Sequence, residues 1–282
     1  MLELNLLDET FDRNQSHNYH LSIQTSSNGI SICVLDTVRN KYIGLRHHRL
    51  ADSLDWNDGS LLKNIVESDD LLKLSYKSVS NLLVEAENTI VPLAFFEDAK
   101  KEAVFQLNHQ IPPSAKIISN TLTQAAAINI FSSSNGLSKT LNTLFPKIKT
   151  FQRATPFIEQ MVHESAKWAR PKCYVLINNH SVDIGLAQLK KLEFYNSFDY
   201  KENSDIVYFI LSVLEQFKLS AMYTDVYVSV DKENHHELFD FLNNYLNMIR
   251  FIRPSELFTY SYIFDELQLT RFANLFNLAL CE

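Results

Sequence analysis

The sequence predicts an α/β protein in which one βββαβαβ unit occurs twice, with a small α+β insertion in the first copy. A meander of three short strands spans residues 19–46 and returns at residues 173–198, and alternating helix and buried-strand patterns follow each meander. The first and second turns of the meander are 11 residues apart in both copies, at 28 and 39 and at 179 and 190. A pattern that returns with the same internal spacing indicates duplication.

The first meander shows the period-two alternation of half-buried strands. Apolar and polar residues alternate over residues 19–24, and Asn28-Gly29 then supplies a strong hairpin signal. The alternation resumes over residues 30–34, and a turn near Arg39-Asn40 leads to a third strand at residues 42–46.

The rest of the first copy follows with a longer connection. We expect a helix around residues 61–66, a strand within residues 79–85 and a closing strand near residues 148–152. A connecting helix then begins, with Thr155 as its cap and Pro156 in its first turn.

The second copy predicts the same order of elements. After its meander come a helix capped by Ser204 with its apolar face between residues 206 and 217, a strand at residues 225–230, a helix capped by Asn234 with Glu237, and a strand at residues 248–252.

The two copies differ in length, and the difference locates the insertion. The first turns of the two meanders are 151 residues apart, whereas the closing strands are 100 apart, so the first copy carries about 51 extra residues. We place the insertion at about residues 93–133, with a charged helix at 97–107 and strands at 116–121 and 125–131. The predicted domains are a first lobe at 1–154, a connecting helix at 155–170, and a second lobe with a C-terminal tail at 171–282. The tail contains an aromatic alternation at 258–264 and a last helix with Phe272, Leu275, Phe276 and Ala279 on one face.

Charge and composition narrow the classes of function. The net charge of −7 works against contact with a nucleic-acid backbone, which needs clustered Lys and Arg. The first ten residues lack signal-peptide features, no stretch is apolar enough for a membrane helix, and the three cysteines are far apart. We therefore expect a soluble cytoplasmic protein that binds neither nucleic acid nor membranes.

Glycine is scarce. The chain contains 5 glycines, where an average composition would give roughly 20. Loops that wrap phosphates need glycine so that the backbone can approach the ligand, and the scarcity argues against such loops here.

Two βββαβαβ units with an insertion in the first resemble the duplicated ribonuclease-H-like architecture of the actin-like ATPase superfamily, which includes actin and the sugar kinases. Residues 89–96 and 273–282 also look like parts of an uncharacterised bacterial domain-of-unknown-function family, DUF3822, with an actin-like fold. This resemblance covers essentially the whole chain. It implies the fold but no assigned activity.

The resemblance also implies where a nucleotide would lie, in the cleft between the units. ATPases of the superfamily carry a carboxylate at the end of each first strand, a glycine-containing phosphate hairpin and paired glycines for adenosine. The corresponding positions here are Gln24, Thr25, Asn28, Asn178, Asn179, His180 and Asp231. The nearby acid Asp183 is displaced onto the next strand, so all three nucleotide elements depart from the superfamily pattern.

Two hypotheses stay open. The first is a non-catalytic interaction or regulatory protein with a protein partner, no cofactor, no catalytic residue and no metal site. The second is an ATP-binding protein with weak or no hydrolysis, since asparagine amides can hydrogen-bond phosphates in a Mg-ATP complex. A cleft that is open and polar favours the second hypothesis, and one plugged by side chains favours the first.

Other motifs give weaker signals. His163-Glu164 begins like a zinc-protease helix, but Lys167 stands where the second histidine would be. Residues 136–140 end like a phosphate loop but lack the glycine before the lysine, and they are interpreted as a helix start. The aromatic clusters at 194–200 and 258–264 are interpreted mainly as core, with protein binding as the alternative.

Overall fold

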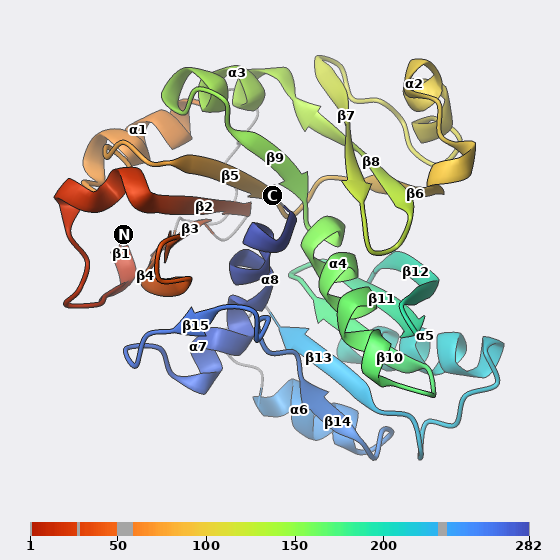
Figure 1. The fold of residues 1–282 in the computed structure, drawn as a ribbon. Coiled ribbons are helices and arrows are strands. Elements are labelled where there is room, and N and C mark those ends of the chain that lie inside the picture. Colours follow the sequence, from red (N-terminus) through yellow and green to blue (C-terminus); the bar gives the residue numbers. More distant parts are fainter. Residues whose placement is uncertain (1, 27–28, 50–58, 231–235, 282) are drawn as a thin grey trace.

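The computed structural model describes residues 2–26, 29–49, 59–230 and 236–281. They form two mixed sheets, one in each lobe, and a small antiparallel sheet (Figure 1). The first sheet has the order β1-β4-β3-β2-β5-β9, with β15 beside β4. Its strands are β1 (Leu2–Leu7), β2 (Tyr19–Ser26), β3 (Gly29–Asp36), β4 (Lys41–Arg49), β5 (Ser78–Leu83), β9 (Lys149–Gln152) and β15 (Thr259–Tyr260).

Helices cover both faces of the first sheet. Helices α1 (Ser60–Ser68) and α3 (Asn135–Leu144) pack on the face that includes Leu21 and Ile32. The opposite face, which includes Cys33 and Tyr42, is covered by the C-terminal segment. Successive side chains along each strand point to opposite faces of the sheet, and both faces are buried.

The second sheet has the order β12-β11-β10-β13-β14, which repeats the order β4-β3-β2-β5-β9 of the first. Its strands are β10 (Lys172–Ile177), β11 (Ser181–Gln188), β12 (Lys191–Asp199), β13 (Val226–Val230) and β14 (Ile249–Phe251). In both sheets an antiparallel meander is extended by two parallel strands. The predicted duplication of the βββαβαβ unit is therefore confirmed.

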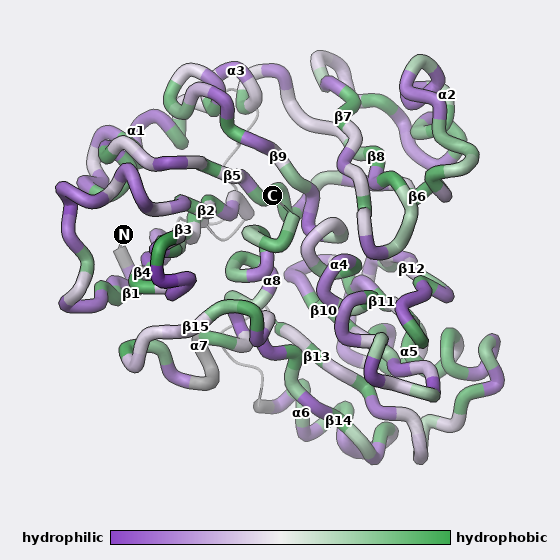
Figure 2. The backbone as a smooth tube through the Cα atoms, viewed as in Figure 1, coloured by the Kyte–Doolittle hydropathy of each residue, from purple (hydrophilic) through white to green (hydrophobic). Residues whose placement is uncertain are grey.

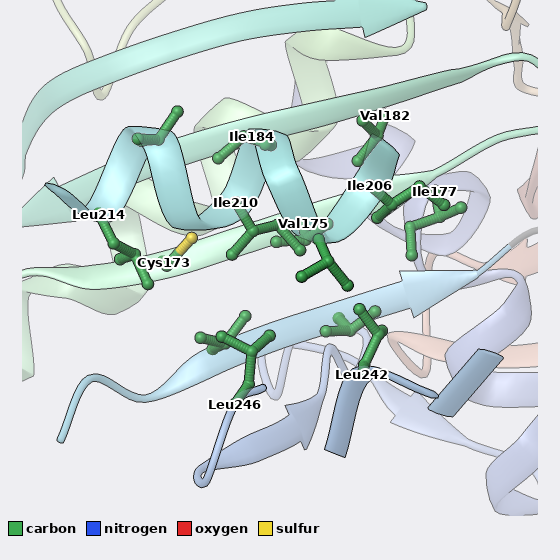
Figure 3. Packing of buried hydrophobic residues seen from close by; sticks show 14 of the residues in the cluster. Cys173, Val175, Ile177, Val182, Ile184, Ile206, Ile210, Leu214, Leu242 and Leu246 are labelled. Atoms are coloured by element: carbon green, nitrogen blue, oxygen red, sulfur yellow. The ribbon is translucent and has the colours of Figure 1, made fainter. Parts of the chain in front are cut away.

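The core of the second lobe lies between this sheet and its helices. Helix α5 (Asn203–Gln216) places Ile206, Ile210 and Leu214 on the β10 and β11 side chains (Figure 3), and α6 (His236–Asn243) adds Leu242. The opposite face of the sheet packs against α4 (Ala154–Glu164), which is buried between the lobes.

The third sheet, β6-β8-β7, is the inserted subdomain. Its strands are β6 (Asn88–Pro92), β7 (Ala115–Leu122) and β8 (Ala127–Ser134). The predicted charged helix at 97–107 is wrong in extent. Residues 97–107 form one 3-10 turn, η3 (Asp98–Lys100), and a short α2 (Lys101–Phe105), and η2 (Leu93–Phe95) precedes them. Phe105 is the only residue of α2 that is fully buried in the subdomain core, with Val104 partly buried beside it.

The C-terminal segment crosses back to the first sheet. After α7 (Glu266–Arg271) come α8 (Ala273–Phe276) and η5 (Asn277–Cys281), a largely hydrophobic stretch drawn mainly in green in Figure 2. The Tyr42 hydroxyl of β4 donates a hydrogen bond to the Phe276 carbonyl, and the two rings pack edge to face. The carboxyl end of the chain therefore lies against the first lobe (Figure 1). The domain boundaries themselves stay predictions.

Some local predictions are wrong or fall outside the described residues. Thr155 lies inside the first turn of α4, after the cap residue Arg153. Helix α5 is capped by a capping box of Glu202 and Asp205, since Ser204 already lies within the helix. The predicted cap Asn234 is outside the described residues. Strand β1 was not predicted. The 3-10 helices η1 (Arg13–Asn18) and η4 (Ser165–Lys167) complete the described elements, and no helix among them could span a membrane.

Candidate functional site at the junction of the lobes

A buried ion pair joins the two lobes. Arg153 directly follows β9 of the first sheet, and Asp183 lies on β11 of the second. The Arg153 Nε donates to Asp183 Oδ2 at 2.6 Å, and Nη2 donates to Oδ1 at 2.9 Å. Asp183 is fully buried and Arg153 is 6% exposed. Separating the pair would leave a charge buried without a partner, so the pair holds the two sheets together.

Arg153 has further partners on both lobes. It donates to the Val84 carbonyl and to the hydroxyl oxygens of Ser181 at 3.1 Å and Ser197 at 2.9 Å. Burial acts to lower the pKa of Arg153, but the Asp183 carboxylate outweighs it and raises that pKa further above its usual value. All three guanidinium nitrogens therefore donate within the protein.

A buried polar network fixes the backbone that leads to Arg153. The Asn129 side chain of the inserted subdomain donates to Gln152 Oε1 at 3.1 Å, and that same oxygen accepts from the Ala154 amide at 2.7 Å. Gln152 in turn donates to the Ala86 carbonyl at 2.9 Å. Asn129 and Gln152 are fully buried, so the network ties the insertion to the strand end that carries the arginine.

Beside the ion pair lies a cavity of about 730 Å³. Its volume is in the range of small-ligand sites. The first lobe and its insertion contribute residues 84–90, Asn108, His109 and Arg153, and the second lobe contributes residues 178–181, residues 195–197 and Asp199.

The structure brings only part of the predicted cleft together. Asn178, Asn179 and His180 line the cavity. Gln24 and Thr25 are not among its lining residues. Both are buried within β2, where the Thr25 hydroxyl donates to the Leu82 carbonyl. The remaining two predicted positions, Asn28 and Asp231, lie outside the described residues.

The lining of the cavity is acidic. It carries the carboxylates of Glu85, Glu87 and Asp199 against a single guanidinium, that of Arg153. Since Arg153 is already paired with Asp183, the cavity presents a surplus of negative charge. Burial, together with the Asp183 carboxylate, raises the pKa of Tyr195 well above its usual range, so the phenol on the wall stays neutral.

Asn178 leaves a hydrogen-bond donor unused on this wall. The residue is 6% exposed, and its side-chain nitrogen has no hydrogen-bond partner in the part of the chain that the structure describes. A buried amide without a partner is uncommon and costs free energy, which marks the position as one that a ligand could satisfy.

Sequence reasoning missed the charged half of the site. Glu85 and Glu87 follow β5, and Arg153 follows β9, two neighbouring parallel strands. Ligands of open α/β sheets bind beyond the carboxyl ends of parallel strands, so charged residues at two such ends were the available signal. Among the described residues, no group of three or more His, Cys, Asp or Glu side chains could hold a metal ion.

Solved structures with the same fold cover nearly the whole chain. A protein from Bacteroides thetaiotaomicron with an actin-like ATPase fold and unknown function is 22% identical, with a TM-score of 0.83 over 97% of this chain and 100% of that one. In the PilM-PilN type IV pilus biogenesis complex, one chain is 11% identical, with a TM-score of 0.58 over 93% of this chain and 97% of that one. The ethanolamine utilization protein EutJ from Carboxydothermus hydrogenoformans is 9% identical, with a TM-score of 0.52 over 98% of this chain and 93% of that one.

These similarities confirm the predicted actin-like fold. No curated protein matches the chain significantly. The family model described as "Protein of unknown function (DUF3822)" matches residues 8–249. With this match over most of its length and an actin-like fold throughout, the chain belongs to the DUF3822 family.

Proposed function

We propose that the protein is a non-catalytic interaction or regulatory protein built on the actin-like scaffold. The observation that carries this proposal is the charge of the interlobe cavity. Three carboxylates face it, while its one guanidinium is engaged by Asp183. A nucleoside triphosphate needs cations and free backbone amides around its phosphates, and the guanidinium of Arg153 is not free to act as such a cation.

A partner protein suits the scaffold. PilM, whose fold is similar to that of this chain, is known in a complex with PilN. That likeness extends to the fold alone, but it provides a precedent for an actin-like scaffold that engages another protein. We propose a protein partner for this chain on the same scaffold.

Weak binding of ATP is the second candidate function. It is favoured by the three cavity residues Asn178, Asn179 and His180, which come from the hairpin that the superfamily resemblance assigns to phosphates. An asparagine amide can donate to a phosphate oxygen, and Asn178 has such a donor unused.

Thermal unfolding with and without excess Mg-ATP separates the two candidates. A ligand that binds only the folded state raises its stability by mass action. We expect no shift of Tm beyond that caused by Mg-tripolyphosphate at equal ionic strength. A reproducible shift specific to ATP, lost in Asn178→Leu, would overturn the interaction-only proposal and establish the cavity as a nucleotide site.

A further inference from the structure

Residues from the edge strands of two sheets line the cavity. Strand β12 is the edge of the five-stranded sheet, and β6 is the edge of the inserted sheet. Both strands contribute to the lining, β6 through residues 88–90 and β12 through residues 195–197 and Asp199.

The β12 edge has backbone groups that β11 does not bond. Just after β12, the Tyr200 amide donates to the His180 carbonyl at 3.1 Å. This bond shows which residues of β12 direct their backbone groups towards β11. Backbone bonding alternates along an antiparallel pair, so the N–H and C=O groups of Tyr195, Ser197 and Asp199 point away from β11. All three residues line the cavity, and the described part of the chain provides no backbone partner for them.

The β6 edge is partly closed. The Ser132 amide donates to the Glu87 carbonyl. Because backbone bonding alternates along the antiparallel pair of β6 and β8, the backbone groups of Asn88 and Ile90 point away from β8. His109 Nε2 lies 3.0 Å from the Asn88 carbonyl and covers it. The more open edge, and therefore the one available for strand addition, is β12.

The charge of the lining residues indicates which kind of ligand the cavity binds. Glu87 of the first lobe and Asp199 of the second both line the cavity, and a cationic side chain placed between the two lobes would complement both carboxylates. Glu87 contacts His109 at 3.6 Å, whereas no cation is recorded beside Asp199 within the described ranges.

From these observations we propose that the cavity binds an extended segment of a partner protein, which pairs with the β12 edge and places a Lys or Arg side chain between Glu87 and Asp199. This inference deepens the proposed function and rests on it. Strand addition to an exposed edge gains affinity from main-chain hydrogen bonds and specificity from alternate side chains. Here the unbonded backbone groups of β12 would supply the main-chain hydrogen bonds, and the acidic lining would select a basic side chain.

The test is selection from a random seven-residue peptide library displayed on phage, with the whole protein as bait. We expect the enriched peptides to share one basic position. A synthetic peptide of the consensus is then titrated by calorimetry against the wild type and against Glu87→Gln and Asp199→Asn, which should bind about ten- to a hundredfold more weakly. Glu193→Gln is the matched control, because Glu193 lies on β12 outside the cavity, and it should bind like the wild type.

Hydrogen exchange locates the peptide. The outward amides of Tyr195, Ser197 and Asp199 should exchange rapidly in the free protein and slowly in the complex. The proposal is overturned if no basic position is enriched, if the two cavity variants bind as tightly as Glu193→Gln, or if protection appears away from β12. Such a failure leaves the proposed function standing, since that function is decided separately by the Mg-ATP titration.

Discussion

Arg153 and Asp183 form a bidentate ion pair at 2.6 and 2.9 Å between the end of β9 and the middle of β11. The pair crosses from one lobe to the other, and Arg153 lines the cavity. A carboxylate is thus present beside the interlobe hairpin, but it serves to hold an arginine. Asp183, which departs from the ATPase pattern because it lies on the next strand, therefore has a structural role in pairing with Arg153.

Breaking this pair should destabilise the protein strongly. Arg153→Ala leaves Asp183 buried without a counter-ion, which typically costs about 3–5 kcal/mol. Lys100→Ala removes the exposed pair with Glu97 and should cost less than about 1 kcal/mol. Urea unfolding of the two variants measures the difference, and equal midpoints would contradict the assigned role of the interlobe pair.

The buried network at Asn129 should be needed to attach the insertion. Asn129→Ala removes the hydrogen bonds that the Asn129 amide donates to Gln152 Oε1 and to the Thr155 hydroxyl in the buried interior, and we expect a loss of about 1–3 kcal/mol. Asn142→Ala is the control, because the Asn142 side chain bonds only to its own helix at an exposed position and its removal should change stability by about 0.5 kcal/mol or less. Chemical denaturation measures the free energy of unfolding of both variants. If Asn129→Ala loses as little stability as Asn142→Ala, the network is not needed to attach the insertion.

The C-terminal segment should protect Cys33. Phe276 is fully buried on the first sheet, and Cys33 lies beneath the same segment. Phe276→Ala should cost about 3–5 kcal/mol and make Cys33 reactive to a thiol reagent, as read by mass spectrometry of the labelled peptides. Tyr262→Ala, at a side chain that is 76% exposed, should leave Cys33 protected. Labelling of Cys33 that does not change with Phe276 would exclude this docking.

Asp8 should make the stability fall in acid. Burial acts to raise the pKa of Asp8, but hydrogen bonds from Lys41, Ser261 and Thr10 outweigh it and hold the pKa well below its usual range. A folded-state pKa that is lowered contributes stability above the unfolded value, about 4, and that contribution is lost as the pH falls below it. Asp8→Asn should therefore be less stable than the wild type at pH 7, by about 1.5–3 kcal/mol.

The gap between Asp8→Asn and the wild type should narrow as the pH is lowered from about 4 towards 1. Stability measured by urea unfolding across this range provides the check. A gap that is constant with pH would show that the carboxylate charge is not what stabilises the contact between the N-terminal segment, β4 and Ser261.

Local patterns in the sequence determined the elements and their duplication. Alternation of apolar residues, the turn at Asn179 and the apolar face of α5 depend on neighbours a few positions away, so they predict strands and helices without knowledge of the fold. The departures at Asn178 to His180 were visible for the same reason. The length of α2 was predicted wrongly, because the extent of this short helix depends on how Phe105 and Val104 pack in the core of the inserted subdomain.

The tertiary structure alone decided what fills the junction of the lobes. Arg153 and Asp183 are 30 residues apart in sequence, and Glu87 and Asp199 are still further apart, so no local pattern brings them together. The sequence placed both Gln24 and Asn178 in the cleft, but only Asn178 lines the cavity. The physical reason is that burial and pairing of a charge depend on which strand ends meet across the two sheets, and that is set by the packing of whole lobes.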